Sequence, residues 1–145
     1  MDIKDLVYRV IRDIFRIGKV SSVNGKNCTV RVTFPDKDNM VSDELPVIVI
    51  GSYGTKGYWV PEVKTQVLCC FLPIISGLGL NKGFVLGGFY SVEDPPEETD
   101  PDVRCLKLPD GSYFRFDGKG EIHIHASKHM ILTAPRIDLN PPGGD

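Results

Sequence analysis

His123 and His125 form the residue pattern with the clearest potential for chemistry in this chain. Imidazole nitrogens are good ligands for iron, nickel and other transition metals. Side chains two residues apart in a β-strand point to the same face, so the pair could offer two ligands to one ion. Ile122 and Ile124 would then occupy the opposite face of the strand. The orientation of this strand therefore decides whether the histidines or the isoleucines are buried.

A cluster of carboxylates in the first third of the chain is a second candidate for chemistry. Calcium binding or acid–base catalysis could use its members, which are Asp36, Asp38, Asp43 and Glu44. They have no helper histidine and lack the spacing of an EF-hand loop. The sequence also contains no nucleophile elbow, P-loop or metalloprotease motif. We therefore predict a solvated loop here, no catalytic residue and no enzymatic activity.

Three aromatic residues in a glycine-rich stretch, Tyr53, Tyr58 and Trp59, could stack on bases or sugars. The stretch has only Lys56 as a positive charge, which is little for a groove that binds phosphates. The favoured interpretation is that these aromatic side chains pack on the protein itself or against a neighbouring protomer.

The composition sets limits on location and partners. The chain is 41% hydrophobic and 25% charged, with a net charge of −2, and no apolar run approaches the roughly 18 residues of a membrane span. Charged residues recur through residues 1–16, unlike a signal peptide, so we expect a cytoplasmic origin. Acidic residues gather after residue 92, which argues against a nucleic-acid partner for the tail. The adjacent Cys69 and Cys70 would point to opposite faces of a strand, so we predict reduced cysteines.

The first ninety residues predict a helix followed by a small barrel. Residues 1–14 have apolar side chains at helical spacing, and the resulting stripe either covers a barrel end or docks on a partner. Residues 15–92 predict a five-stranded closed barrel, with a hairpin at Asn24-Gly25 and further strands over 45–50, 67–72 and 84–90. The strand over 67–72 is apolar throughout, so we predict burial on both faces. Residues 77–83 predict a turn.

Residues 93–103 form a proline-rich acidic linker, and residues 104–145 contain pairs of apolar residues two apart. Each pair predicts a short strand with one apolar face, and the set cannot close a core within one chain. An intertwined homotrimer, a triple-stranded β-helix, would bury these rows on its axis. The predicted axis-facing residues are Leu106, Leu108, Phe114, Phe116, Ile122, Ile124, Met130, Leu132, Ile137 and Leu139. The predicted fold class is all-β with an N-terminal helix.

Several segments together resemble the phage baseplate assembly protein V family, the central spike of contractile tails. They are residues 30–38, 41–47, 58–61, 65–68, 83–91 and 131–140, in this order. The resemblance extends to spike modules of bacteriocins and type VI secretion. It implies an OB-fold barrel and a trimeric needle at the tip of a contractile injection system, which pierces the target cell envelope when the sheath contracts. The implied partners are tail hub, tube and baseplate proteins and a tip-capping protein.

Some spikes of that family carry iron on an HxH motif, which leaves two interpretations of His123 and His125. On the three-fold axis, three chains would offer six imidazoles to an iron ion. That arrangement would turn Ile122 and Ile124 toward solvent, because a one-residue shift reverses every side chain. We predict exposed histidines and no cofactor, with axial iron as the alternative. The competing function is an OB-fold module that binds nucleic acid or carbohydrate and has a tail that is not a needle.

Overall fold

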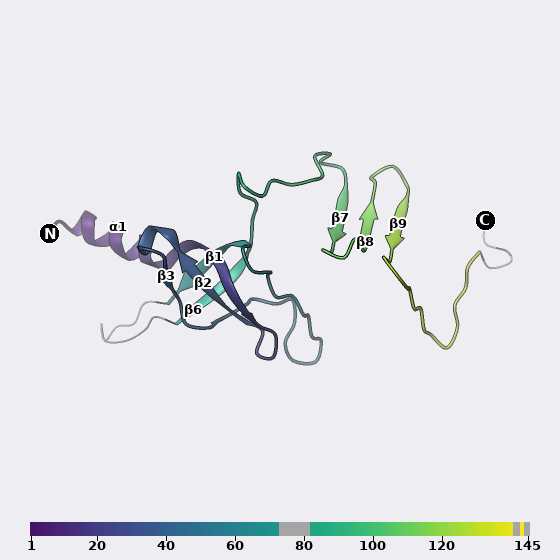
Figure 1. Cartoon of the computed structure of the whole chain (residues 1–145), viewed down its shortest axis with the longest axis horizontal. Coiled ribbons are helices and arrows are strands. Elements are labelled where there is room, and N and C mark those ends of the chain that lie inside the picture. Colours follow the sequence, from purple (N-terminus) through teal and green to yellow (C-terminus); the bar gives the residue numbers. More distant parts are fainter. Residues whose placement is uncertain (73–81, 141–142, 144–145) are drawn as a thin grey trace. The chain divides into compact units, whose positions relative to one another are not determined.

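The computed structural model describes residues 1–72, 82–140 and 143. Most of the turn predicted over residues 77–83 lies outside these described residues. Within the described residues the chain has one α-helix and is otherwise mostly β, with antiparallel sheets (Figure 1). It divides into two compact units, Met1–Pro95 and Pro96–Asp145, called here the N-terminal and C-terminal units.

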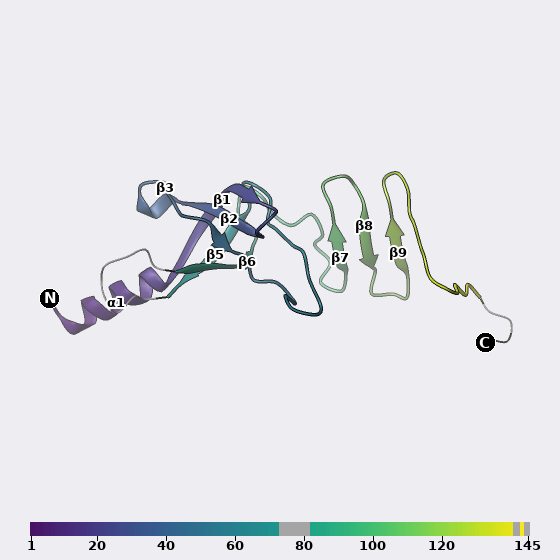
Figure 2. The same cartoon turned by 90° about the horizontal axis from the view of Figure 1, so that it is seen from below.

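Helix α1 spans Ile3–Ile14, which confirms the predicted N-terminal helix. Asp2 caps it, its side chain accepting a hydrogen bond from the backbone N–H of Lys4 at 3.5 Å. None of its residues is buried, and Figures 1 and 2 show α1 projecting away from the strands that follow. The helix therefore does not cover a barrel end with its apolar stripe.

The N-terminal unit contains a sheet whose strands are paired in the order β3-β2-β1-β5-β6, with β4 paired to β2. The predicted hairpin is confirmed, since Asn24 and Thr29 are paired across a turn that contains Gly25. A 3-10 turn, Pro35–Lys37, follows the second strand. The strands are β1 (Phe15–Asn24), β2 (Thr29–Phe34), β3 (Met40–Val41), β4 (Leu45–Pro46), β5 (Gln66–Phe71) and β6 (Gly83–Gly88).

The strands of this unit are paired in a closed ring, in the order β1-β2-β4-β6-β5 and back to β1. β1 pairs with β2 on one side and with β5 on the other, and β5 pairs with β6. Val47, next to β4, forms a parallel bridge with Val85 of β6, and the N–H of Ile48 donates to the Val85 carbonyl at 2.9 Å. β4 completes the ring through the pairing of Leu45 with Val30. The ring leaves few free edges, as closure does in small barrels.

The core of the N-terminal unit lies inside this ring. Phe34 and Phe71 meet edge to face there, with ring centroids 5.8 Å apart. Aliphatic side chains from every longer strand fill the rest, because alternate residues of each strand point inward. The buried set is Val20, Val30, Val32, Phe34, Leu45, Val67, Cys69, Phe71 and Val85.

The predicted burial of residues 67–72 on both faces is wrong, because only one face of β5 is buried. Val67, Cys69 and Phe71 are buried, whereas the alternate positions are only half-buried. The outward Leu68 instead lines a shallow apolar hollow with Ile17, Leu86 and Phe89. A barrel strand has one face on the core, and its outer face is covered only if something else packs there. The opposite faces of Cys69 and Cys70 are as predicted.

The predicted strand over residues 45–50 is also wrong beyond Pro46. β4 has only two residues, followed by the bridge at Val47. The chain then crosses from β2 to β6: the Val47 N–H donates to the Cys28 carbonyl at 3.2 Å, and the Ile48 N–H donates to the Val85 carbonyl of β6 at 2.9 Å.

The C-terminal unit contains an antiparallel three-stranded sheet in the order β7-β8-β9 (Figures 1 and 2). Its strands are β7 (Arg104–Lys107), β8 (Tyr113–Phe116) and β9 (Ile122–His125). The expected strands around Met130–Leu132 and Ile137–Leu139 are absent from the described residues of this chain. A strand needs a neighbour for its backbone hydrogen bonds, and this chain offers none along residues 126–140.

Gly18 has no room for a side chain, so Gly18→Ala is expected to destabilise the N-terminal unit. A Cβ at this position would overlap the Val32 side chain and would lie 2.6 Å from the Thr33 carbonyl oxygen. Overpacking of this kind costs about 1–3 kcal/mol of unfolding free energy. Urea unfolding followed by circular dichroism measures it, and Gly25→Ala, with no atom within 4 Å of the new Cβ, is the control. Equal midpoints for the two variants would contradict the close approach.

Candidate functional site

One face of the C-terminal sheet is apolar and exposed. Leu106, Phe114 and Ile124 are aligned across the three strands, and Phe116 is aligned with Ile122. The rings of Phe114 and Phe116 meet edge to face at 4.7 Å. Even so, exposed fractions range from 38% for Phe116 to 61% for Ile124. This group of five side chains is called the apolar face below.

The opposite face of the same sheet is polar and carries the two histidines. His123 is aligned with Arg115, and His125 with Tyr113. The His125 and Tyr113 rings stack with centroids 5.2 Å apart, and His123 Nε2 lies 3.0 Å from a carboxylate oxygen of Glu121. The structure thus places the histidines away from Ile122 and Ile124, as strand alternation requires.

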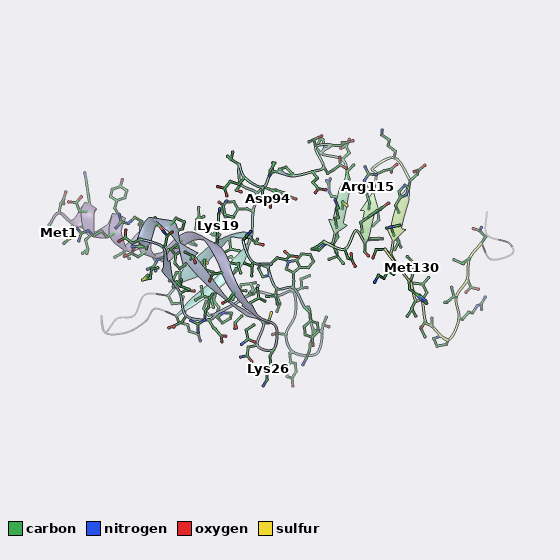
Figure 3. All side chains as sticks on the ribbon, viewed as in Figure 1. Met1, Lys19, Lys26, Asp94, Arg115 and Met130 are labelled. Carbon is green, nitrogen blue, oxygen red and sulfur yellow. The ribbon has the colours of Figure 1, made fainter. Side chains whose placement is uncertain are left out.

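Acidic residues from the predicted linker make ion pairs with the polar face. Glu97 pairs with Lys107 at 2.5 Å, and Glu98 pairs with Arg115 of β8, which Figure 3 labels, at 3.2 Å. The hydrogen bond that Lys107 donates to Glu97 raises the pKa of Lys107. The pKa of Glu98 is lowered, first by a hydrogen bond from the backbone of Asp100 and then by Arg115. The polar face therefore has partners within its own unit, whereas the apolar face is left exposed.

These ion pairs were not found by the sequence analysis. A signal for them exists: acidic residues precede a sheet in which Lys107 and Arg115 occupy the positions that alternate with apolar ones. Arg104 was also missed as a neighbour of the apolar face, where it is aligned with Phe116. Its guanidinium donates to the carbonyls of Pro101 and Val103.

Two aspartates fix the turns that hold the three strands in register. Asp110 Oδ1 accepts a hydrogen bond from the Ser112 N–H at 2.8 Å. Asp117 Oδ1 accepts from the N–H groups of Lys119 and Glu121, at 2.7 and 3.0 Å. These backbone hydrogen bonds lower the pKa of both carboxyl groups.

Gly118, in the second of these turns, is required by its backbone conformation. It has a φ of +77°, and a Cβ there would lie 2.8 Å from the carbonyl oxygen of Asp102. The turn thus packs against the segment that leads into β7, and a side chain would be strained for two reasons.

The remaining predicted axis residues lie outside strands β7, β8 and β9. Leu108 follows β7 at the first turn, where its N–H donates to the Ser112 carbonyl. The others lie in the extended segment after β9 that Figure 3 marks at Met130, and all are exposed. They are Met130, Leu132, Ile137 and Leu139. Their position on a trimer axis stays a prediction.

The N-terminal unit has a second exposed apolar surface, a hollow that includes Trp59, Tyr58 and Tyr90. Trp59 is 51% exposed and Tyr58 81%, so the N-terminal unit covers about half of the Trp59 surface and little of Tyr58. Glu62 and Asp94 also line the hollow. Their negative charge disfavours a phosphate ligand.

The carboxylate cluster does not form a metal site in the described part of the chain. Across residues 1–72, 82–140 and 143, no three histidine, cysteine, aspartate or glutamate side chains are grouped to hold an ion. Glu44 instead accepts a hydrogen bond from Asn24 at 2.9 Å. No helix among these residues is long and apolar enough to cross a membrane.

These features define a mostly β protein whose C-terminal sheet leaves one apolar face open. No protein-family model matches the chain. Over 129 residues, 87% of its length, the sequence is 26% identical to the Spike protein of Escherichia phage P2. The matched region covers 57% of that protein, so the chain corresponds to little more than half of the relative's length.

Protonation of Asp117 in acid is expected to lower the stability of the C-terminal sheet. Its lowered pKa means that the carboxylate stabilises the fold above the unfolded value of about 3.9, and the stabilisation is lost as the pH falls through the folded pKa. Asp117→Ala should lower the thermal midpoint at pH 7, while Asp117→Asn, which keeps an acceptor, should lower it less. Circular dichroism from pH 7 to about 2 measures both. An acid profile that is the same in wild type and Asp117→Asn would contradict this role.

Proposed function

We propose that the chain is a non-enzymatic, homotrimeric central spike of a contractile tail or contractile injection system. In this proposal the C-terminal unit is the needle and the N-terminal unit is its mount. The needle pierces the target cell envelope when the sheath contracts. The chain would be made in the bacterial cytoplasm and assembled into the baseplate of a phage or phage-tail-like particle.

The observation that carries the proposal is the contrast between the two faces of the C-terminal sheet. The polar face is neutralised by Glu97 and Glu98 of its own chain, while the five side chains of the apolar face remain open. Complete burial of one large apolar side chain stabilises by about 1.5–3 kcal/mol. Other copies of the chain, which bring the same surface, can supply that burial.

The similarity to the phage P2 Spike protein supports a tail-spike role. The closed strand order β1-β2-β4-β6-β5 supports an OB-fold barrel of the kind that spike mounts use. The extended residues 126–140 could gain strand partners from neighbouring chains in a triple-stranded β-helix, which would place Met130 and Leu132 on the axis. This arrangement accounts for strands that the single chain lacks.

The mechanism depends on stiffness rather than on chemistry. A closed trimer with a packed axis and paired backbones resists bending, since protein interiors are as dense as organic crystals. Outward charges such as Arg115 with Glu98 keep the needle from associating side to side. The proposed partners are hub, tube and baseplate proteins, with a tip-capping protein and, transiently, the target envelope.

The second candidate is a carbohydrate-binding module, which the aromatic hollow around Trp59 favours. The acidic Glu62 and Asp94 in the same hollow count against a nucleic-acid ligand. This function would leave the apolar face of the C-terminal sheet without a role.

Ile124→Ser is expected to dissociate the trimer, because it puts a hydroxyl on the apolar face that the proposed trimer buries. His123→Ser, the same replacement on the opposite face of β9, is the matched control and should keep the wild-type mass. Gel filtration with light scattering measures the mass of both. A three-chain mass for Ile124→Ser, or dissociation by His123→Ser alone, would mean that the faces are assigned the wrong way round.

The orientation of β9 also predicts that the trimer carries no iron on the HxH motif. His123 Nε2 lies 3.0 Å from a carboxylate oxygen of Glu121, and His125 stacks on Tyr113, so both rings have partners on the face opposite Ile122 and Ile124. Elemental analysis of the purified trimer should find no transition metal near one per three chains. A stoichiometric metal that is lost in His123→Ser would show that the histidines face the axis.

A further inference from the structure

The apolar stripe of α1 is largely exposed in the described part of the chain. Leu6, Val7, Val10 and Ile11 are each about half exposed, Ile3 is 77% exposed, and Ile14 in the last turn is partly buried. The helix has 12 residues, and isolated helices shorter than about 12–15 residues are marginal in water. A helix of this length that buries nothing needs an external surface to stabilise it.

The last turn of α1 is fixed to the barrel, so the helix cannot fold back over it freely. β1 begins at Phe15, immediately after the helix ends, with no loop between them. Lys37 pairs with Asp13 at 3.0 Å, and Arg16 donates to the Asp13 carbonyl at 3.2 Å. The Lys37 hydrogen bond lowers the pKa of Asp13. The apolar stripe is therefore held out from the barrel and is available to another molecule.

The spacing of the stripe fits a short coiled coil. Ile3, Val7, Val10 and Ile14 are separated by four, three and four residues, the alternation of d and a positions in a heptad. Leu6 and Ile11 flank them and widen the stripe. The seam has isoleucine at one d position (Ile3) and one a position (Ile14). Isoleucine at both kinds of position favours three or four helices over two.

The charges on the other side of the helix permit close approach of identical copies. Lys4, Arg9 and Arg12 are balanced by Asp5, Asp13 and the capping Asp2. The helix as a whole is therefore neutral, with a sum of −1 for Asp2, Lys4 and Asp5 near its start and +1 for Arg9, Arg12 and Asp13 near its end. A partner that recognises α1 by charge would need a net charge on the helix, and the charges of residues 2–13 sum to zero.

We propose that α1 of three copies packs into a parallel three-helix bundle, with Ile3, Val7, Val10 and Ile14 as its seam. The inference rests on the proposed trimer and adds a second, N-terminal point of self-association. The bundle would hold the three barrels together independently of the C-terminal sheets.

Cysteine cross-linking tests this bundle. In the full chain with Cys105→Ser, which removes the exposed native cysteine, Val7→Cys places a thiol in the seam and Arg9→Cys places one on the polar side. Seam positions lie within reach of a disulfide, whereas outward positions do not. Mild oxidation should shift Val7→Cys from a one-chain to a two-chain band on a non-reducing gel and leave Arg9→Cys unshifted.

The native mass of the same samples distinguishes failure of the helix bundle from failure of the proposed trimer. A three-chain mass without a Val7→Cys cross-link overturns the bundle, leaves the spike proposal intact and points to a hub protein as the occupant of the stripe. A one-chain mass overturns both. Equal cross-linking of Val7→Cys and Arg9→Cys also overturns the bundle. Val10→Cys replaces Val7→Cys if that variant does not fold, and the same results apply.

Discussion

The alternation of side chains in the C-terminal sheet is the constraint on which the rest of the structure depends. With Leu106, Phe114 and Ile124 on one face, Arg115 and His123 must lie on the other. A single three-stranded layer has nothing of its own to cover the apolar face, since domains are built from at least two packed layers. In the proposed trimer, other copies of the chain supply the second layer.

The acidic segment before β7 pairs with the basic side chains on only one face of this sheet. Exposed ion pairs such as Glu98–Arg115 contribute little stability by themselves. Their effect is on specificity: they occupy the polar face, so that association through the other face is the arrangement left open. Apolar burial would then provide most of the free energy of assembly, and the ion pairs would decide which face is buried.

Much of the fold followed from local patterns, and the prediction for β5 failed where tertiary packing decides burial. The helix over Ile3–Ile14 and the hairpin at Gly25 depend on residues close in sequence, and both were predicted. The two-sided burial predicted for β5 was wrong, because it depends on what packs against the strand, which periodicity does not record. The strand near Leu132 depends on neighbouring chains and stays a prediction. For the candidate site, alternation placed Ile124 and His123 on opposite faces, but the ion pairs of Glu97 and Glu98 require knowledge of how the chain turns.

Sedimentation equilibrium of the full, unmodified chain tests the central claim most directly, because it measures mass without regard to shape. The chain mass is 16.1 kDa, and the account predicts a single species of three times that value that does not dissociate on dilution. A one-chain mass would contradict self-association through the apolar face. A two-chain mass would indicate two sheets packed face to face and would contradict the trimeric needle.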